Sequence, residues 1–393
     1  MKLFSNIGAL TETVGPRNIV DDTMAFPLLI QRILGQNILN PNSTWKTTIV
    51  HHIASAALII YIILGTYEIL SNTTDIKDIA EAFYTYAIIG IIIIKYFLYT
   101  NEKIMFRKLY VKAKTCILDI ISEDSHEGMV KVLHRTKRIL FLMFAAIVLP
   151  VGSYVVRVFW YYAKGERVLI SKTTSTLLPM TSPYYEIATG FHAIFMASIA
   201  STYVVIDMWI IFLMNLYCSA SDCVVKIVNV NKEDEENMEN YELRLNEHLR
   251  KFYLRHVKLV EYLHILNETL KWQSLVPLIT VIVLSCIPML SMSKEFDLTF
   301  ATNITPTIVE VFVYNWFGEQ IKTKSNALRD ALIHFDWVNL QLKDKKNYYV
   351  IVSFMNKDFG VTTAFGSELS LITMTSVLKA SYQAFTMLIQ MTV

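Results

Sequence analysis

Apolar residues along this chain gather in blocks about 20 residues long, separated by polar and charged segments. A helix of about 20 residues, rising about 1.5 Å per residue, is long enough to cross the ~30 Å hydrocarbon core of a membrane. The pattern predicts seven such helices, at residues 45–64, 79–99, 139–160, 187–217, 272–292, 297–317 and 369–393. No Gly-rich or Ser-rich linker divides the chain, so we expect an all-α membrane protein in which residues 1–393 form a single domain.

Two of the polar segments carry apolar residues at helical spacing. In residues 240–271 and 318–345 the leucines and aromatic residues recur every three or four positions, which is typical of an amphipathic helix. We therefore expect an extension at 218–271, between the fourth and fifth spans, whose helix continues into the fifth span. We also expect an anchor segment at 318–368.

The distribution of basic residues predicts the orientation. Of the 36 Lys and Arg residues, 28 lie in segments 1–46, 100–138, 218–271 and 318–368, five lie in the alternate loops and three lie inside spans. Basic residues accumulate on the cytoplasmic side. The N-terminus, the extension and the anchor segment are thus predicted to be cytoplasmic, and the C-terminus extracellular. Residues 1–44 lack the apolar run of a signal peptide, so we expect the first span to insert as its own anchor.

Cysteines and glycosylation sequons fit this orientation. None of the four cysteines falls in a predicted outer loop, so no disulfide framework is expected. Asn72 begins an Asn-x-Thr sequon in the first outer loop and is the predicted glycosylation site.

The last apolar block contains a polar stripe. Thr375, Lys379, Gln383, Thr386 and Gln390 are spaced by four, four, three and four residues, which places them on one face of a helix. A lysine in the middle of a bilayer costs ~2.5–3.5 kcal/mol on insertion scales, so this face cannot point at lipid. It is either buried against other helices or lines a water-filled conduit, and the pattern alone leaves both interpretations open.

Other charges that fall inside predicted spans include Lys95, Arg157, Asp207 and Glu310. Glu310 is predicted at a depth comparable to that of Lys379, and we expect the two to pair. Lys95 and Arg157 lie near span ends, from which long side chains reach the interface. For Asp207 we expect a structural hydrogen-bonding role.

Other function classes find little support in the sequence. Three histidines of segment 240–271 recur every eight residues, which a helix does not bring together, and no other metal, cofactor, catalytic or nucleic-acid-binding motif is present. Two alternatives are disfavoured. The orientation is opposite to that of a metabotropic seven-span receptor, and the chain lacks the repeated halves typical of a transporter.

Three segments carry a resemblance to a known family. YNWFGEQIKTKSNALRDALIHFDW, SVLKASYQAFTMLIQ and the N-terminal MAFPLLIQRILG resemble insect odorant receptors. This resemblance implies a tetrameric ligand-gated cation channel whose pore is lined by residues 369–393. The implied pore residues are Lys379, Gln383, Thr386, Met387, Gln390 and Met391, and the constriction is formed by the last three.

The resemblance also implies partners, a ligand and a place in the cell. The chain lacks the longer insert of the family's coreceptor, so it resembles the odorant-tuning subunit of a heterotetramer in the plasma membrane of olfactory sensory dendrites. The ligand would be a small volatile odorant or pheromone, bound among the outer halves of the second to sixth spans. The residues implied there are Phe83, Tyr84, Ala87, Gly152, Val155, Val156, Phe159, Phe191, Phe195, Met196, Met289, Ile308 and Phe312.

Overall fold

In the computed structural model, helices account for nearly all of the described chain. The structure describes residues 24–36, 49–72, 76–124, 126–168, 170, 179–230, 237–292, 298–357 and 359–392. The helices are α2 (Ala25–Ile33), α3 (Ile49–Asn72), α4 (Ile76–Asn101), α5 (Lys103–Lys112), a π-helical segment (Ala113–Ile117), α6 (Leu118–Asp124), α7 (His126–Ala163), α8 (Tyr184–Val228), α9 (Met238–Leu270), α10 (Leu275–Met292), α11 (Leu298–Ile333), a 3-10 turn (Trp337–Asn339), α12 (Leu342–Met355) and α13 (Leu371–Thr392). Within these ranges, the one β-type pairing is an isolated bridge between Thr362 and Glu368.

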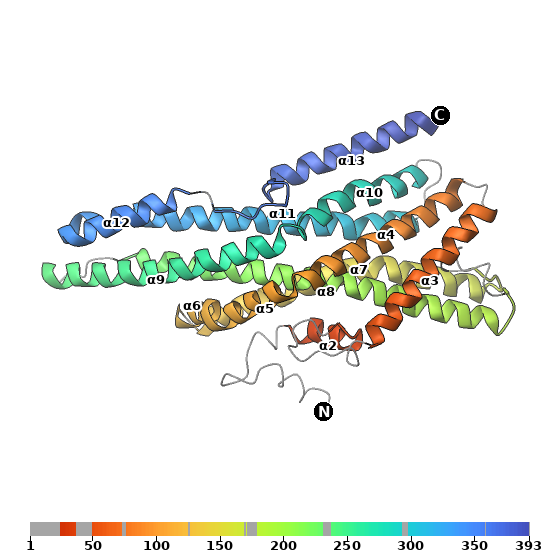
Figure 1. The fold of residues 1–393 in the computed structure, drawn as a ribbon, viewed down its shortest axis with the longest axis horizontal. Coiled ribbons are helices and arrows are strands. Elements are labelled where there is room, and N and C mark those ends of the chain that lie inside the picture. The colour runs from red at the N-terminus through yellow and green to blue at the C-terminus, as the bar shows by residue number, and fades with distance from the viewer. Residues whose placement is uncertain are drawn as a thin grey trace, which may run out of the picture.

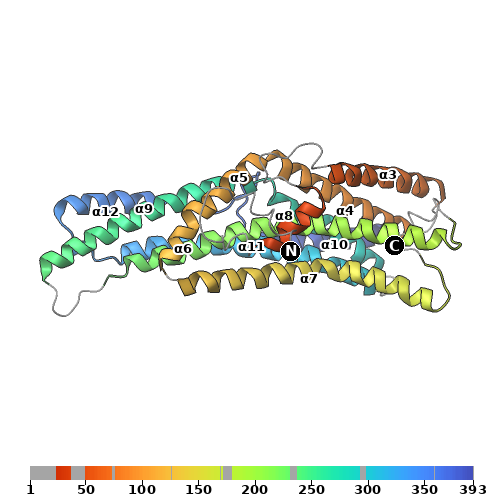
Figure 2. The same ribbon diagram turned by 90° about the horizontal axis from the view of Figure 1, so that it is seen from below.

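The long helices lie along one axis and form an elongated bundle (Figure 1). α9 and α12 lie at one end, and α3 and the C-terminal end of α13 lie at the other. The 45 residues of α8 span ~67 Å, far more than a bilayer needs. Figure 2 shows α8 in the middle of the bundle, with α7 along one side and α4 along the other.

The central position of α8 follows from its sequence. From residue 203 to residue 217 every residue is buried, and the stretch YVVIDMWIIFLMNLY is apolar almost all round. A helix with no polar face has no side to offer to water, so it is stable only when neighbours cover it on all sides. α8 is therefore the core helix against which α4, α7, α9 and α11 pack.

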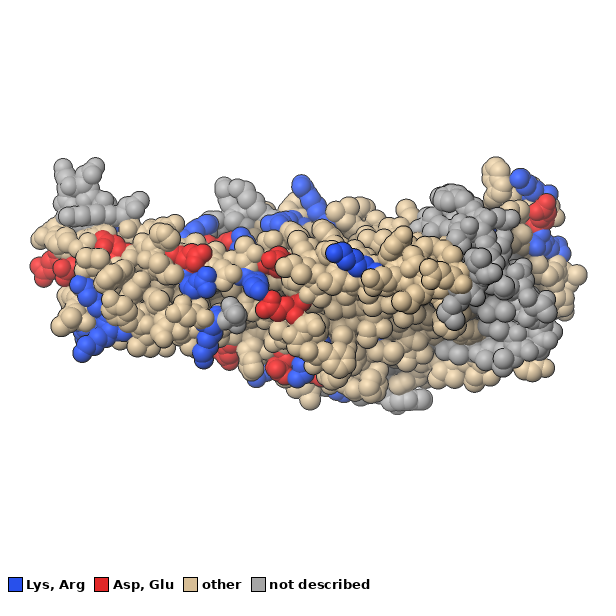
Figure 3. Space-filling model, turned by 90° about the horizontal axis from the view of Figure 1, so that it is seen from above, with Lys and Arg blue, Asp and Glu red and all other residues tan. Residues whose placement is uncertain are grey.

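The outer surface of the bundle divides into a charged part and an apolar part. In Figure 3, Lys, Arg, Asp and Glu gather over the half that contains α9 and α12, whereas much of the adjoining half is uncharged. Large apolar side chains on α4 and α7 are exposed, among them Phe97, Phe141 and Trp160. Such a surface suits lipid rather than water.

Four stretches of the described chain are long and apolar enough to cross a membrane: Phe83–Asn101, His134–Ala163, Tyr184–Val228 and Met238–Cys286. The expectation of an all-α protein is thereby confirmed, and these four stretches are compatible with the expected membrane helices. The count of seven spans and the orientation of the termini stay predictions.

The structure changes two of the predicted boundaries. The helix predicted at 240–271 does not run on unbroken, because a turn at residues 271–274 separates α9 from α10. The helix predicted at 318–345 is not a separate element. Its first half continues the sixth predicted span as α11, which ends at Ile333, and α12 begins only at Leu342.

The charged end of the bundle has an aromatic interior. The Tyr348 ring stacks on Trp337 at 6.0 Å between centroids, and its hydroxyl donates to the Leu332 carbonyl at 3.1 Å. On α9, the buried His256 stacks on Phe252 at 5.7 Å between centroids. Burial lowers the pKa of His256 from its ordinary 6.5 to about 4, because the surroundings disfavour the charged imidazolium.

Candidate functional site

A mainly apolar cavity of about 110 Å³ lies inside the bundle. It is enclosed by α4, α7, α8, α10 and α11, which correspond to the second to sixth predicted spans. Its lining comprises Tyr84, Thr85, Ile88, Ile89, Ile91, Ile92, Pro150, Val151, Tyr154, Ile170, Met196, Ile199, Ala200, Tyr203, Leu284, Pro306 and Thr307. Two of these residues, Pro150 and Pro306, are prolines inside helices. Such a cavity suits a small apolar molecule with one or two polar atoms.

Most of the ligand-binding residues implied by the resemblance do not line this cavity. Only Tyr84 and Met196 belong to its lining. Phe195 is buried against Ile89, a lining residue. The half-buried members are Ala87, Gly152, Val155 and Met289, and the exposed members are Phe83, Val156, Phe159, Phe191, Ile308 and Phe312.

The difference between the implied residues and the lining residues concerns the side of each helix and not its depth. Phe83 adjoins Tyr84 and Ile308 adjoins Thr307, yet the first residue of each pair is exposed and the second lines the cavity. Neighbouring positions on a helix point about 100° apart. Where a helix is apolar all round, its sequence does not tell which side faces the interior and which faces lipid.

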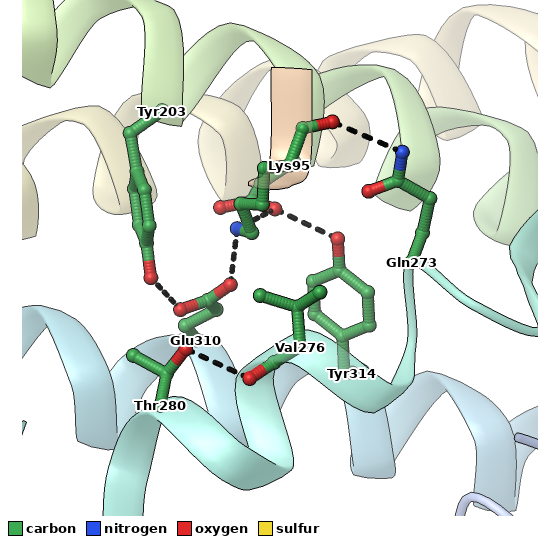
Figure 4. A network of polar contacts seen from close by, with 8 residues as sticks. Lys95, Tyr203, Gln273, Val276, Thr280, Glu310 and Tyr314 are labelled. Atoms are coloured by element: carbon green, nitrogen blue, oxygen red, sulfur yellow. Dashed lines mark hydrogen bonds and ion pairs between the residues drawn. The ribbon is translucent and has the colours of Figure 1, made fainter. Parts of the chain in front are cut away.

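A buried ion cluster holds α4, α8 and α11 together (Figure 4). The Lys95 ammonium contacts Asp207 Oδ1 at 2.7 Å and also pairs with Glu310. It lies 3.8 Å from the centroid of the Tyr203 ring. The Tyr203 hydroxyl donates to Glu310, and the Tyr314 hydroxyl donates to Asp207 Oδ1 at 2.7 Å. Lys95 and Asp207 are fully buried and Glu310 is 1% exposed.

The cluster holds more acceptors than donors. Two carboxylates share one ammonium, and the second oxygen of Asp207, Oδ2, accepts no hydrogen bond from the residues described. On the backbone side, the Gln273 amide donates to the Lys95 carbonyl at 3.3 Å. Charges buried in this way persist only when they are paired, which makes the cluster an obligatory unit of the fold.

Two expectations about these charges are wrong. Glu310 pairs with Lys95 and not with Lys379, whose side chain is exposed. Lys95 does not extend to a membrane interface but points into the protein. The structural role expected for Asp207 agrees with its contacts to Lys95 and Tyr314.

The ion cluster lies one helical turn beyond the end of the cavity that is lined by Ile92, Tyr203 and Thr307. We call this end the floor of the cavity. α4, α8 and α11 run in the same direction along the bundle (Figure 1), and on each of them a lining residue is followed three or four positions later by a charged one. The pairs are Ile92 and Lys95 on α4, Tyr203 and Asp207 on α8, and Thr307 and Glu310 on α11. Sequence reasoning missed this arrangement, although three charges at similar depth in three parallel spans were a signal for it.

The polar stripe of α13 is largely exposed. Lys379, Gln383 and Gln390 are exposed, Thr386 is half-buried and Met387 is 64% exposed. Part of the stripe borders an open groove lined by Thr375, Leu378, Lys379, Tyr382 and Gln383. The side chain of Met391, the remaining implied pore residue, lies outside the described part of the chain. The stripe is thus not buried against other helices of the same chain.

The opposite side of α13 packs on α10 and α11. Met374, Val377 and Leu378 lie against the buried residues Leu278 and Val311. Ser381 makes a buried hydroxyl contact with a serine of α10. These contacts hold α13 by one flank and leave its polar face open.

The sequence Phe317-Gly318-Glu319 explains how α13 is placed. Gly318 lies on α11 where the chain leading into α13 crosses it, and a Cβ there would be 2.3 Å from the Leu369 carbonyl oxygen. Only glycine allows this approach. The next residue, Glu319, accepts a hydrogen bond from the Leu371 amide at 3.4 Å, at the first turn of α13.

Other candidate chemistry finds no support among the described residues. No group of three or more His, Cys, Asp or Glu side chains could hold a metal ion there. Cys116, Cys218, Cys223 and Cys286 are free thiols. The glycosylation residue Asn72 is the last residue of α3, and its side chain lies outside the described part.

Long apolar helices around an apolar cavity are typical of an all-helical membrane protein, and the comparisons with known proteins specify its family. The family described as "7tm Odorant receptor" matches residues 75–382, well over half of the sequence. The chain belongs to this odorant receptor family, which confirms the resemblance inferred from its motifs. The family is one of receptors, not of enzymes.

Solved structures share the fold. Two that match are the insect olfactory receptor OR5 from Machilis hrabei and the same receptor in complex with eugenol. The first has a TM-score of 0.73 and 12% sequence identity, over 95% of this chain and 98% of that one. The second has a TM-score of 0.69 and 12% identity, over 94% of this chain and 100% of that one. Among curated proteins no match was found.

Proposed function

We propose that this protein is the odorant-tuning subunit of a ligand-gated cation channel. A small volatile odorant or pheromone binds in the cavity, and the polar face of α13 lines the pore. The subunit works as a heterotetramer with the coreceptor in the plasma membrane of olfactory sensory dendrites. The proposed topology is seven spans with a cytoplasmic N-terminus and an extracellular C-terminus.

The single observation that carries this proposal is the exposed polar face of α13. A helix that packs one flank on apolar neighbours and exposes a lysine and two glutamines on the other is costly if that face meets lipid. Water in a pore at the centre of an assembly of subunits removes this cost. The chain therefore needs partner subunits to complete the conduit.

The cavity supports the ligand part of the proposal. It is apolar and largely enclosed by helices, and its place in the bundle separates it from the exposed face of α13. OR5 is the similar structure solved with a small volatile, eugenol. Binding of a volatile in the cavity rests mainly on apolar contacts, which give modest affinity and broad selectivity.

Current recording tests the channel. Cells that express this chain, the coreceptor or both are exposed to a panel of volatiles, and an odorant-evoked cation current beyond that of the coreceptor alone is expected only with both. A metabotropic receptor or a transporter predicts no such dependence on the coreceptor. Equal responses without the coreceptor contradict the heteromer.

A pair of matched substitutions tests the cavity. Ala200 lines it, whereas Ala197, one turn earlier on α8, is exposed. Ala200→Phe is expected to fill the cavity and raise the half-maximal odorant concentration at least tenfold, while Ala197→Phe leaves it unchanged. Equal effects of both substitutions would place the ligand elsewhere.

The pore is tested by cysteine accessibility on α13. Gln383→Cys and Gln390→Cys are expected to react with hydrophilic thiol reagents and to change the current, because both side chains are exposed. Ser381→Cys, on the flank that packs on α10, serves as the buried control. Protection of both glutamine positions in resting and stimulated channels would refute the pore assignment.

A further inference from the structure

Two hydroxyl groups on the cluster side of the cavity have their protons engaged within the protein. Tyr203 donates its proton to Glu310, and Thr307 donates its own to the Ile304 carbonyl at 2.8 Å. Both residues line the cavity. A hydroxyl has one proton to donate and two lone pairs that accept. What Tyr203 and Thr307 offer a bound molecule is therefore acceptor capacity.

The charges beneath this floor act in the same direction. Asp207 and Glu310 outnumber Lys95, their one described cationic partner, and Asp207 Oδ2 accepts no hydrogen bond from the residues described. The cluster lies in a water-poor interior, where the electrostatic effect of such an excess of acceptors is stronger than in water. The positively polarised hydrogen of an O–H group is stabilised next to the cluster, whereas a carbonyl oxygen or an organic anion is repelled.

We propose that the floor of the cavity selects odorants whose polar end carries an O–H donor. Small alcohols and phenols are preferred over aldehydes and ketones of the same carbon skeleton, and over carboxylates. Tyr203 and Thr307 are the specificity-determining residues, and the ion cluster fixes the direction of the Tyr203 hydroxyl. This inference rests on the proposed function, in which the cavity is the odorant site.

The size of the preference follows from one hydrogen bond. A neutral hydrogen bond between buried partners corresponds to about a three- to tenfold difference in affinity. The probes are benzyl alcohol against benzaldehyde and cyclohexanol against cyclohexanone, because the members of each pair have nearly the same size and shape. Binding to the purified full-length chain is measured as the probe concentration that gives half of the maximal thermal stabilisation.

The two possible failures differ in this experiment. The alcohol of each pair is expected to bind about three- to tenfold more tightly. If the aldehyde or ketone binds equally or better, the floor does not select donors, although the cavity still binds volatiles. If no probe of either kind binds, the proposed function of the cavity fails, and this inference fails with it.

Substitutions then assign the preference to the floor. Tyr203→Phe and Thr307→Val are each expected to bring the alcohol-to-carbonyl ratio towards one while carbonyl probes keep their affinity. The matched control is Tyr217→Phe, because Tyr217 also lies buried on α8 and joins its hydroxyl to α11, at Ser325 with 2.8 Å, but it does not line the cavity. A ratio that survives both floor substitutions, or that Tyr217→Phe lowers equally, overturns the assignment. If Tyr203→Phe does not fold, Thr307→Val decides.

Discussion

Replacing Lys95 by methionine is the most severe single test of the ion cluster. Methionine matches the lysine side chain as far as Cε and lacks only the ammonium group, so the substitution opens little space, but it leaves Asp207 and Glu310 facing each other without their shared counter-charge. It also removes the contact of the ammonium with the Tyr203 ring. Because the cluster is fully buried, water does not replace the lost partner. Removing one member of such a buried pair costs about 3–5 kcal/mol.

The assay is thermal unfolding of the detergent-solubilised protein, together with its amount at the cell surface. Lys95→Met is expected to lower both strongly. Adding Asp207→Asn and Glu310→Gln removes the uncompensated charges, so the triple variant is expected to recover most of the stability. If Lys95→Met alone is as stable as the natural chain, or if the triple variant is no better than the single one, the lysine is not the counter-ion of these carboxylates.

Three further predictions concern other parts of the molecule. Gly318→Ala is expected to lower the free energy of unfolding by about 1–3 kcal/mol, because its Cβ would meet the Leu369 carbonyl oxygen at 2.3 Å, whereas Gly190→Ala, with no atom within 4 Å, is expected to cost nothing. The free energy of unfolding is expected to fall by on the order of 3 kcal/mol as the pH drops from 6.5 to about 4, because folding holds His256 neutral. In a pH series of thermal unfolding, His256→Phe should lose less stability over this range. An equal loss in this variant would contradict the role of His256. Ser381→Ala is expected to lower the stability by about 1 kcal/mol through loss of its hydroxyl contact with α10, and a stability unchanged by this substitution would show that the contact is dispensable.

Much of the fold could be predicted because the apolar blocks are long and separate. The block at 79–99 became α4, Ile76–Asn101, and the block at 272–292 became α10, Leu275–Met292. Helix ends were harder to predict. α11 continues from an apolar stretch into an amphipathic one, and Gly318, which directly follows the predicted span, does not end the helix, so the sequence suggested two elements where the structure has one.

The site was predictable in depth but not in detail. The polar face of α13 is visible in the sequence because its residues differ from their apolar neighbours. The cavity is not, because its walls and the outer surface are made of the same residue types, as Phe83 and Tyr84 show. The pairing of Lys95 with Asp207 joins residues 112 positions apart, and only the packing of α4 on α8 brings them together.

α11 has a mechanical consequence of its own. It is one uninterrupted rod from the cavity wall to the charged end of the bundle, and Pro306 lies at the cavity level, where the missing amide proton weakens the helix. From Pro306 to Ile333 the rod extends ~40 Å, so a tilt of about 3° at the proline displaces its far end by roughly 2 Å. A small ligand in the cavity that displaces the short part of α11 before Pro306 would therefore move the distant end of the helix, at Ile333, by a larger distance than it moves the residues that it contacts.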